Sequence, residues 1–284
     1  DVKIALIGCQ AQTQKEKLLS WPNVRWVVGN QRKMDLVSVL KEFDQLEPAL
    51  VTPTITREPF TIDHPGIDAE HTRANIKIQD GCDFFCSFCE IPYARGRARS
   101  RVFNDILKEC RNLVDAGYKE IILTGINIGT YSFEKYTLLD VINAIEQIDG
   151  LERIRISSIE PTTVAYPLIE KMAQKTKLCR YLHIPLQSGD DDVLKAMERK
   201  YDSSEFFGFI RRAHEAVPEI CIGTDVIVGF PGETPEQFNN TYERLLEGPV
   251  HYFHVFSYSD RYLAKARNFT DKVPSQAISE RSER

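Results

Sequence analysis

The sequence has 284 residues, of which 42% are hydrophobic and 27% are charged. These fractions are typical of a globular protein and exclude collagen-like repeats and extended disorder. The 36 basic and 41 acidic residues give a formal net charge of −5, which excludes a uniformly basic nucleic-acid-binding protein but not a local basic surface. Apolar runs stay well short of the roughly 18 residues of a membrane helix, and the first residues lack a signal-peptide pattern. We therefore expect a cytoplasmic protein without a membrane partner.

The first 50 residues predict a fragment of a small α/β domain. Strands are expected at 2–7 and 24–28, and helices near 12–19 and 34–43. Because the first strand looks like a buried parallel strand whose neighbours would precede it, we expect that an N-terminal part is missing. Residues 51–70 contain Pro53, Pro59 and Pro65 and are expected to form a linker.

Residues 71–284 alternate strands with amphipathic helices. A stripe of apolar side chains followed by Gly117 predicts a helix over 105–116, and Thr234 followed by Pro235 predicts the start of another. Strands are expected near 75–79, 120–124, 153–158, 180–184, 221–228 and 251–257. Six strands joined by helices imply a parallel sheet with right-handed crossovers, either an α/β barrel or an open doubly wound sheet.

Polar, glycine-containing segments directly follow five of these strands. They are Gly81–Cys89, Thr124–Tyr131, Ser157–Pro161, His183–Gly189 and Gly229–Thr234. In both candidate folds the carboxyl ends of the strands meet on one side, where ligands bind. We therefore expect one functional site built from these five segments.

Three of the seven cysteines, Cys82, Cys86 and Cys89, lie within eight residues in a C-x3-C-x2-C pattern. One loop with this spacing can wrap its thiolates around a [4Fe–4S] cluster and leave one iron without a protein ligand. The aromatic side chain of Phe88 would help to shield such a cluster. A zinc site is the alternative, and it would need a fourth ligand such as His71.

This cysteine pattern, on the loop after the first strand, resembles the signature of the radical S-adenosylmethionine enzymes, and further segments resemble their methylthiotransferase branch. These segments are Ile78–Cys82, Cys89–Arg101, His183–Gly189, Met197–Arg199 and Gly223–Thr234. The resemblance implies a partial TIM-like barrel of about six β/α units over residues 71–284. It also implies a [4Fe–4S] cluster that reduces S-adenosylmethionine, an electron donor such as flavodoxin or ferredoxin, and a 5′-deoxyadenosyl radical that prepares an inert carbon for a methylthio group.

The substrate expected from the resemblance is tRNA. The loop Thr124–Tyr131 is similar to that of enzymes that modify C2 of N6-threonylcarbamoyladenosine next to the anticodon. The alternatives are isopentenyladenosine in tRNA, an aspartate of a ribosomal protein, or a catalytically incomplete fragment that binds RNA.

The segments at the strand ends also supply expected contacts to S-adenosylmethionine. Glycines would let the backbone approach the cofactor, Glu160 would bind its ribose or amino group, and the backbone at Phe230 would reach its adenine. The expected set is Phe88, Gly125, Asn127, Glu160, Gln187, Gly229 and Phe230. A surface carboxylate at Glu160 and a structural loop amide at Gln187 are the alternatives, and His183 is interpreted as a packed core residue.

Two further expectations concern the second cluster and the RNA. Cys9 matches the last of three cysteines that hold a second [4Fe–4S] cluster in a full-length member of the family, so residues 1–50 correspond to the end of that domain, and the C-terminal RNA-binding β-barrel is expected to be absent. The densest basic run in the chain is expected to contact phosphates of the anticodon stem-loop. It comprises Arg95, Arg97, Arg99 and Arg101.

Overall fold

The computed structural model describes residues 2–43, 47–62, 66 and 72–284. The N-terminal unit is a three-stranded parallel sheet in the order β1 (Ile4–Ile7), β2 (Val24–Val28) and β3 (Ala49–Val51). One face packs on α1 (Cys9–Gln14) and α2 (Glu16–Leu19), the other on α3 (Leu36–Glu42), which follows the 3-10 turn η1 (Lys33–Asp35). The helix expected over 12–19 is thus two helices, interrupted where Lys15 takes a φ of 37°.

Six parallel strands form the larger unit, at the positions that hydrophobic patterning predicts. Three pair in the order β10 (Arg153–Ile156), β7 (Glu120–Thr124) and β4 (Arg73–Lys77), and three in the order β11 (Tyr181–His183), β12 (Cys221–Val228) and β13 (Tyr252–Ser257). A parallel bridge joins the two groups of strands: Leu178, three residues before β11, pairs with Ile154 of β10. The expectation of a partial parallel barrel is confirmed.

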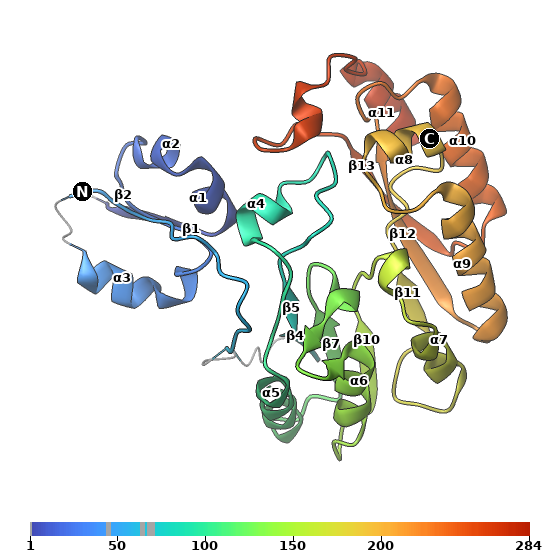
Figure 1. Ribbon diagram of the computed structural model, residues 1–284, viewed down its shortest axis with the longest axis horizontal. Helices are drawn as coiled ribbons and strands as arrows, with labels where there is room; N and C mark the ends of the chain where they lie inside the picture. Colours follow the sequence, from blue (N-terminus) through green and yellow to red (C-terminus); the bar gives the residue numbers. More distant parts are fainter. Residues whose placement is uncertain (1, 44–46, 63–65, 67–71) are drawn as a thin grey trace.

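Helices cover the outside of this curved sheet (Figure 1). They are α5 (Phe103–Asp115), α6 (Leu138–Glu146), α7 (Tyr166–Ala173), α8 (Asp191–Ala196), α9 (Ser203–Ala216), α10 (Pro235–Glu247) and α11 (Ser275–Glu283). The predicted start of α10 is correct, since the Thr234 hydroxyl accepts from the Gln237 amide at 3.2 Å. One large apolar core joins α5, α6, α7 and α9 to the strands, and a smaller cluster around Phe230 packs against α8. Among the described residues, no helix combines the length and apolar character needed to cross a membrane.

Short strands, helices and turns follow the carboxyl ends of four of the strands. After β4 come β5 (Gln79–Asp80), α4 (Ile91–Arg95) and β6 (Arg99–Ser100), and after β7 come η2 (Ile128–Thr130), β8 (Ser132–Phe133) and β9 (Tyr136–Thr137). The 3-10 turns η3 (Pro161–Thr163) and η4 (Lys265–Asn268) follow β10 and β13. Helix α4 lies between the N-terminal unit and the barrel (Figure 1), and the Asn30 side chain donates to the Ala94 carbonyl at 2.6 Å across that junction.

Candidate metal centre and cofactor site

The three clustered cysteines lie on the loop between β5 and α4. Gly81 opens the loop with a φ of +74°, and a Cβ there would stand 2.1 Å from the Arg97 carbonyl oxygen, so only glycine fits. Backbone amides point at two of the sulfurs, from Phe84 to Cys82 Sγ at 3.5 Å and from Ile91 to Cys89 Sγ at 3.4 Å. Such N–H donors stabilise thiolate charge.

The distances between the three thiols help to distinguish a zinc site from an iron–sulfur cluster. Among the described residues, the group whose three possible ligand atoms all lie within 4.8 Å of one another contains no cysteine. At least one pair of the sulfurs of Cys82, Cys86 and Cys89 is therefore farther apart than 4.8 Å, whereas tetrahedral Zn–S bonds of about 2.3 Å would hold each pair at roughly 3.8 Å. A cluster that presents a separate iron to each thiol fits this arrangement. His71, the fourth ligand of the zinc alternative, lies outside the described residues.

Burial keeps these thiols protonated until a metal binds. Desolvation raises the pKa of Cys82 and Cys86, and it raises the pKa of Cys89 to about 11. Metal binding must displace these protons, so cluster assembly is coupled to proton release.

Arg199, three residues after the end of α8, contacts one of the thiols directly. Its Nη1 donates to Cys86 Sγ at 3.2 Å, and its Nη2 donates to Tyr201 Oη at 2.8 Å and forms an ion pair with Glu160. Burial would lower the pKa of Arg199, but Tyr201, Glu160 and Cys86 outweigh it and raise the pKa, so the guanidinium stays charged. Glu160, a predicted cofactor contact, is thus held beside the cluster loop by an arginine. Its role toward S-adenosylmethionine remains a prediction.

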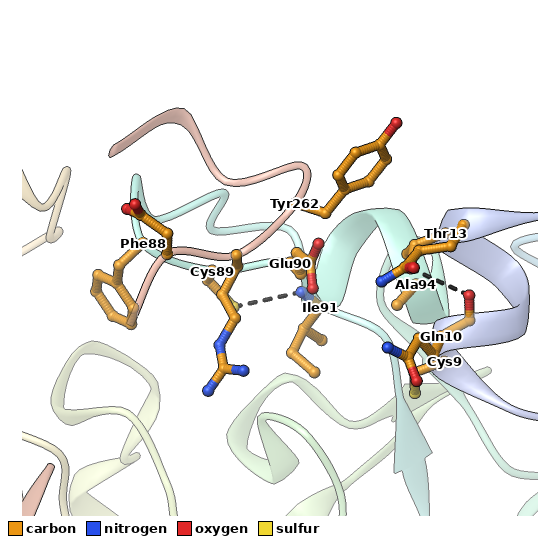
Figure 2. Close-up of a pocket in the computed structure, with 12 residues that line it drawn as sticks. Cys9, Gln10, Thr13, Phe88, Cys89, Glu90, Ile91, Ala94 and Tyr262 are labelled. Carbon is orange, nitrogen blue, oxygen red and sulfur yellow. Dashed lines mark hydrogen bonds between the residues drawn. The ribbon is translucent and has the colours of Figure 1, made fainter. Parts of the chain in front are cut away.

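A cavity of about 730 Å³ opens beside Cys89. Cys9, at the start of α1, lines the same cavity (Figure 2), and its sulfur accepts from Asn30 Nδ2 at 3.4 Å. The remaining lining residues are Gln10, Thr13, Gln14, Phe88, Glu90, Ile91, Ala94, Asp260, Arg261 and Tyr262. The N-terminal unit therefore presents a thiol toward the cluster loop.

Phe88 also borders a second cavity of about 210 Å³, which is lined by Gln187 from the loop after β11 and by Asp225 from β12. The backbone of Gln187 takes a φ of 69° and extends the sheet, since its amide donates to the Asp225 carbonyl at 2.8 Å. Phe88 and Gln187 therefore line one cavity, and their contact with S-adenosylmethionine stays a prediction.

Gly125 and Asn127 are organised by Gln79. The Gln79 Oε1 accepts from the Ile126 and Asn127 amides, both at 2.9 Å, and a Cβ on Gly125 would stand 2.9 Å from the same oxygen. Asn127 is 1% exposed, and its Oδ1 accepts from Thr163 Oγ1 at 3.0 Å. Its Nδ2 has no hydrogen-bond partner among the described residues, so a donor is available there for a bound group.

Gly229 and Phe230 have structural explanations. Gly229 has a φ of +76°, and a Cβ there would stand 2.4 Å from Ile278 Cγ1, so the close approach serves the packing of α11. Phe230 is buried against Tyr258 and Phe269, and its carbonyl already accepts from the Glu233 amide at 2.9 Å. The contact of Phe230 with adenine remains a prediction.

The basic run does not form one surface. Arg101 is 0% exposed, donates to Asp105 at 2.6 Å and pairs with Glu109, so the prediction that it contacts RNA is wrong. Arg95 and Arg99 converge with Lys77 on Asp80, where these cations outweigh burial and lower the pKa of the carboxyl. Only Arg97 is well exposed, at 42%, with its guanidinium over the ring of Phe85 and paired with Asp83.

Some residues of the site were not predicted. Arg199 occurs in a segment that carries the family resemblance, but no spacing in the sequence indicates that it touches Cys86. His183 is buried as expected, yet it hydrogen-bonds Asp225 and Tyr252 instead of packing among apolar side chains. Only the register of three strands brings these groups together.

A partial barrel with a three-cysteine loop after its first strand defines a class of iron–sulfur enzyme, and the comparisons agree. The family model described as the Radical SAM superfamily matches residues 76–245. A solved structure of the cobalamin-dependent S-adenosylmethionine radical enzyme OxsB, with aqua-cobalamin and S-adenosylmethionine bound, superposes with a TM-score of 0.62. The match covers 96% of this chain and 42% of OxsB at 13% identity, and it therefore supports the fold alone.

More similar relatives narrow the class. A protein of Bacillus subtilis named threonylcarbamoyladenosine tRNA methylthiotransferase MtaB is 38% identical over 100% of this chain and 64% of its own. The protein of the same name from Aquifex aeolicus is 36% identical over 98% and 68%. A tRNA-2-methylthio-N(6)-dimethylallyladenosine synthase of Protochlamydia amoebophila is 36% identical over 99% and 64%. The chain belongs to the radical S-adenosylmethionine methylthiotransferase family, and it spans about two thirds of the length of these relatives.

Proposed function

We propose that this protein installs a methylthio group on C2 of N6-threonylcarbamoyladenosine, next to the anticodon of a tRNA. The observation that carries the proposal is the three-cysteine loop that opens onto the same cavity as Cys9, in a chain that is 36–38% identical to proteins named for this reaction. The reaction takes place in the cytoplasm, where the tRNA and an electron donor such as flavodoxin or ferredoxin are present.

Cys82, Cys86 and Cys89 would hold a [4Fe–4S] cluster that binds S-adenosylmethionine. When bound, these groups supply one-electron chemistry that generates a carbon radical. Arg199 donates to Cys86 Sγ and stays charged, so this hydrogen bond stabilises negative charge on the sulfur. Phe88 and Gln187 would position the cofactor from the cavities that they line, and the unpartnered Nδ2 of Asn127 would donate to it. Gly125, Glu160, Gly229 and Phe230 are its remaining expected contacts.

Cys9 would bind a second [4Fe–4S] cluster in the full-length protein. Its thiol lines the cavity of about 730 Å³ that Cys89 also lines, which supports a transfer of the methylthio group over a short path. The anticodon stem-loop would approach this open side. Of the basic run, Arg97 has the exposed guanidinium for a phosphate contact, whereas Arg95 and Arg99 are less exposed and pair with Asp80.

Two assays test this proposal. In the first, the anaerobically reconstituted chain is given S-adenosylmethionine and a reductant, and 5′-deoxyadenosine is measured; Cys82→Ser is the inactive control. No 5′-deoxyadenosine from the wild-type chain would favour the alternative of a fragment that binds RNA without catalysis.

In the second, nucleosides of tRNA from a strain that lacks the gene are analysed by mass spectrometry. We expect loss of the methylthio form of threonylcarbamoyladenosine and its return with the wild-type gene but not with Cys82→Ser. Loss of the methylthio form of isopentenyladenosine would instead assign that substrate. Unchanged tRNA nucleosides, together with loss of the methylthio group on a ribosomal-protein aspartate in peptide mass spectrometry of the same strain, would assign the ribosomal substrate. The isopentenyladenosine alternative is tested because a relative that is 36% identical is named a tRNA-2-methylthio-N(6)-dimethylallyladenosine synthase.

A further inference from the structure

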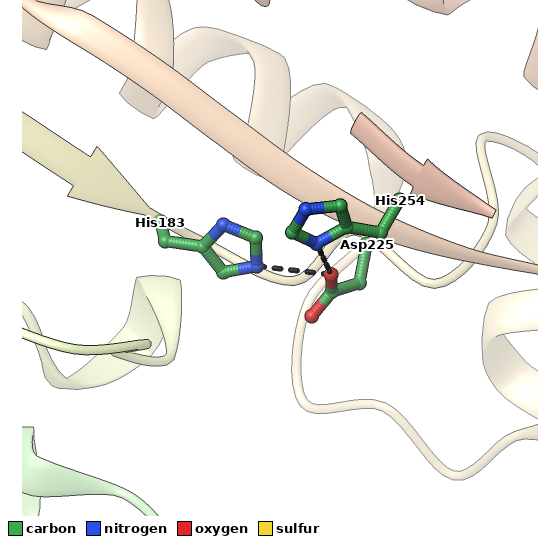
Figure 3. Close-up of side chains that lie close together, drawn as sticks. All are labelled: His183, Asp225 and His254. Atoms are coloured by element: carbon green, nitrogen blue, oxygen red, sulfur yellow. Dashed lines mark hydrogen bonds and ion pairs between the residues drawn. The ribbon is translucent and has the colours of Figure 1, made fainter. Parts of the chain in front are cut away.

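Three neighbouring strands place two histidines and an aspartate side by side, and none of the three belongs to the cysteine loop. His183 ends β11, Asp225 lies within β12, and His254 lies within β13. Asp225 is directly opposite His254 in the parallel register, and His183 is opposite Gly223, two residues before Asp225. Side chains two residues apart on a strand share a face, so all three point to the same side of the sheet (Figure 3).

Both imidazoles approach the same carboxylate oxygen. His183 Nε2 stands 3.0 Å from Asp225 Oδ1, and His254 Nδ1 stands 3.1 Å from it. Ligand atoms at right angles around one metal, with bonds of about 2.1 Å, are roughly 3.0 Å apart. Among the described residues, this is the group of three whose ligand atoms all fall within 4.8 Å of one another.

A tyrosine on the side away from Asp225 sets the orientation of the His183 ring. Its Nδ1 is 3.0 Å from Tyr252 Oη, which in turn is hydrogen-bonded to Tyr181. Tyr252 can reach this position because Gly223 has no side chain; a Cβ there would stand 2.1 Å from the Tyr252 ring. A histidine that ligates a metal characteristically has its other ring nitrogen held in this manner. The hydroxyl therefore directs Nε2 of His183 toward the shared oxygen.

The group is accessible from two sides. His254 has 58% of its side chain exposed, and Asp225 lines the cavity of about 210 Å³ that also contains Phe88 and Gln187. Three protein ligands leave the remaining coordination positions of a metal open. These open positions would face the cavity, where an oxygen atom of a bound molecule could complete the coordination.

We propose that His183, Asp225 and His254 form a binding site for a divalent first-row transition-metal ion, in addition to the iron–sulfur site and without using its thiols. Two imidazoles and one carboxylate suit manganese, iron(II) or zinc, whereas magnesium and calcium prefer oxygen ligands. The site does not depend on the proposed methylthiotransferase reaction.

The test is equilibrium binding of Mn²⁺ to the anaerobically reconstituted full chain, with free Mn²⁺ measured by electron paramagnetic resonance. We expect one Mn²⁺ per chain, still bound when Mg²⁺ is present in tenfold excess. His254→Ala and Asp225→Asn should each weaken binding at least tenfold. His214→Ala removes an exposed histidine of α9 that belongs to another ring pair and should leave binding unchanged.

The same experiment distinguishes this site from the thiols. In the Cys82→Ser variant, Mn²⁺ binding should equal that of the wild-type chain. Binding that is lost in Cys82→Ser but kept in Asp225→Asn would overturn the proposal, because the ion would then sit on the cysteines. Equal affinity in the wild-type and His254→Ala chains would also overturn it and leave the group as a hydrogen-bonded network. Circular dichroism melting curves of each variant confirm that it is folded, and the exposed position of His254 makes its truncation compatible with folding.

Discussion

Replacement of Arg101 by methionine tests whether this arginine serves the fold. Its guanidinium is fully buried, ion-paired with Asp105 and Glu109, and Tyr131 Oη donates to its backbone carbonyl at 2.9 Å. Methionine keeps much of the volume but leaves the buried Glu109 carboxylate without its cation. Removing one partner of a buried ion pair costs about 3–5 kcal/mol. This is a large fraction of the roughly 5–15 kcal/mol by which a domain is stable.

Urea unfolding followed by far-ultraviolet circular dichroism measures this loss. With a slope of about 1–3 kcal/mol per molar urea, the midpoint should fall by at least about 1 M. The matched control is Arg97→Met in the same basic run; since Arg97 is 42% exposed and paired with an exposed Asp83, its unfolding midpoint should change little. The double variant Arg101→Met with Glu109→Gln should recover part of the stability because it removes the unpaired charge. A loss below about 1 kcal/mol in Arg101→Met would refute a structural role for the buried pair.

Three further outcomes are expected. Replacing Arg199 by methionine removes the charge that donates to Cys86 Sγ and should lower the reduction potential of the reconstituted cluster by roughly 60–130 mV. Replacing it by lysine keeps the charge but loses the planar guanidinium, so the potential should lie between those of the wild-type and methionine proteins. Protein-film voltammetry measures both shifts. Burial alone would raise the pKa of Glu146, but hydrogen bonds from Lys171 and Thr176 outweigh it and hold the pKa at about 2. The lowered pKa adds stability that is fully present above the unfolded value of 4.5 and is lost as the pH falls toward 2, so up to about 3 kcal/mol should disappear over that range in wild type and not in Glu146→Gln. Gly229→Ala should lower the melting temperature by several degrees, because its Cβ would meet a side chain of α11 at a φ of +76°; an unchanged melting temperature would contradict this packing.

Local patterns in the chain predict much of the architecture. The strands β7 and β12 begin and end at the residues that their apolar runs indicate, and α10 starts where Thr234 supplies a cap. These features depend on neighbouring residues, so a short window of sequence contains their cause. The cysteine triplet is predictable for the same reason, since its ligands come from one loop.

The interior charges could not be predicted in this way. Arg97 and Arg101 belong to one basic run, yet the first is exposed and the second is buried, because Arg101 follows β6 and faces α5 while Arg97 precedes β6 and lies over Phe85. A run of like charges does not reveal which member will meet a carboxylate from a distant helix.

Contacts between strands far apart in the chain were equally hidden. His183 and His254 are 71 positions apart, and each is unremarkable alone. They meet at Asp225 only because β11, β12 and β13 pair in one parallel register, and Gly223 leaves space for the tyrosine that orients His183. Patterning along the chain thus determines which segments become strands and which loop holds the thiols. The partners of each buried charge depend on how those segments align. A shift of β12 by one residue against its neighbours, for example, would turn Asp225 to the other face of the sheet, away from both histidines.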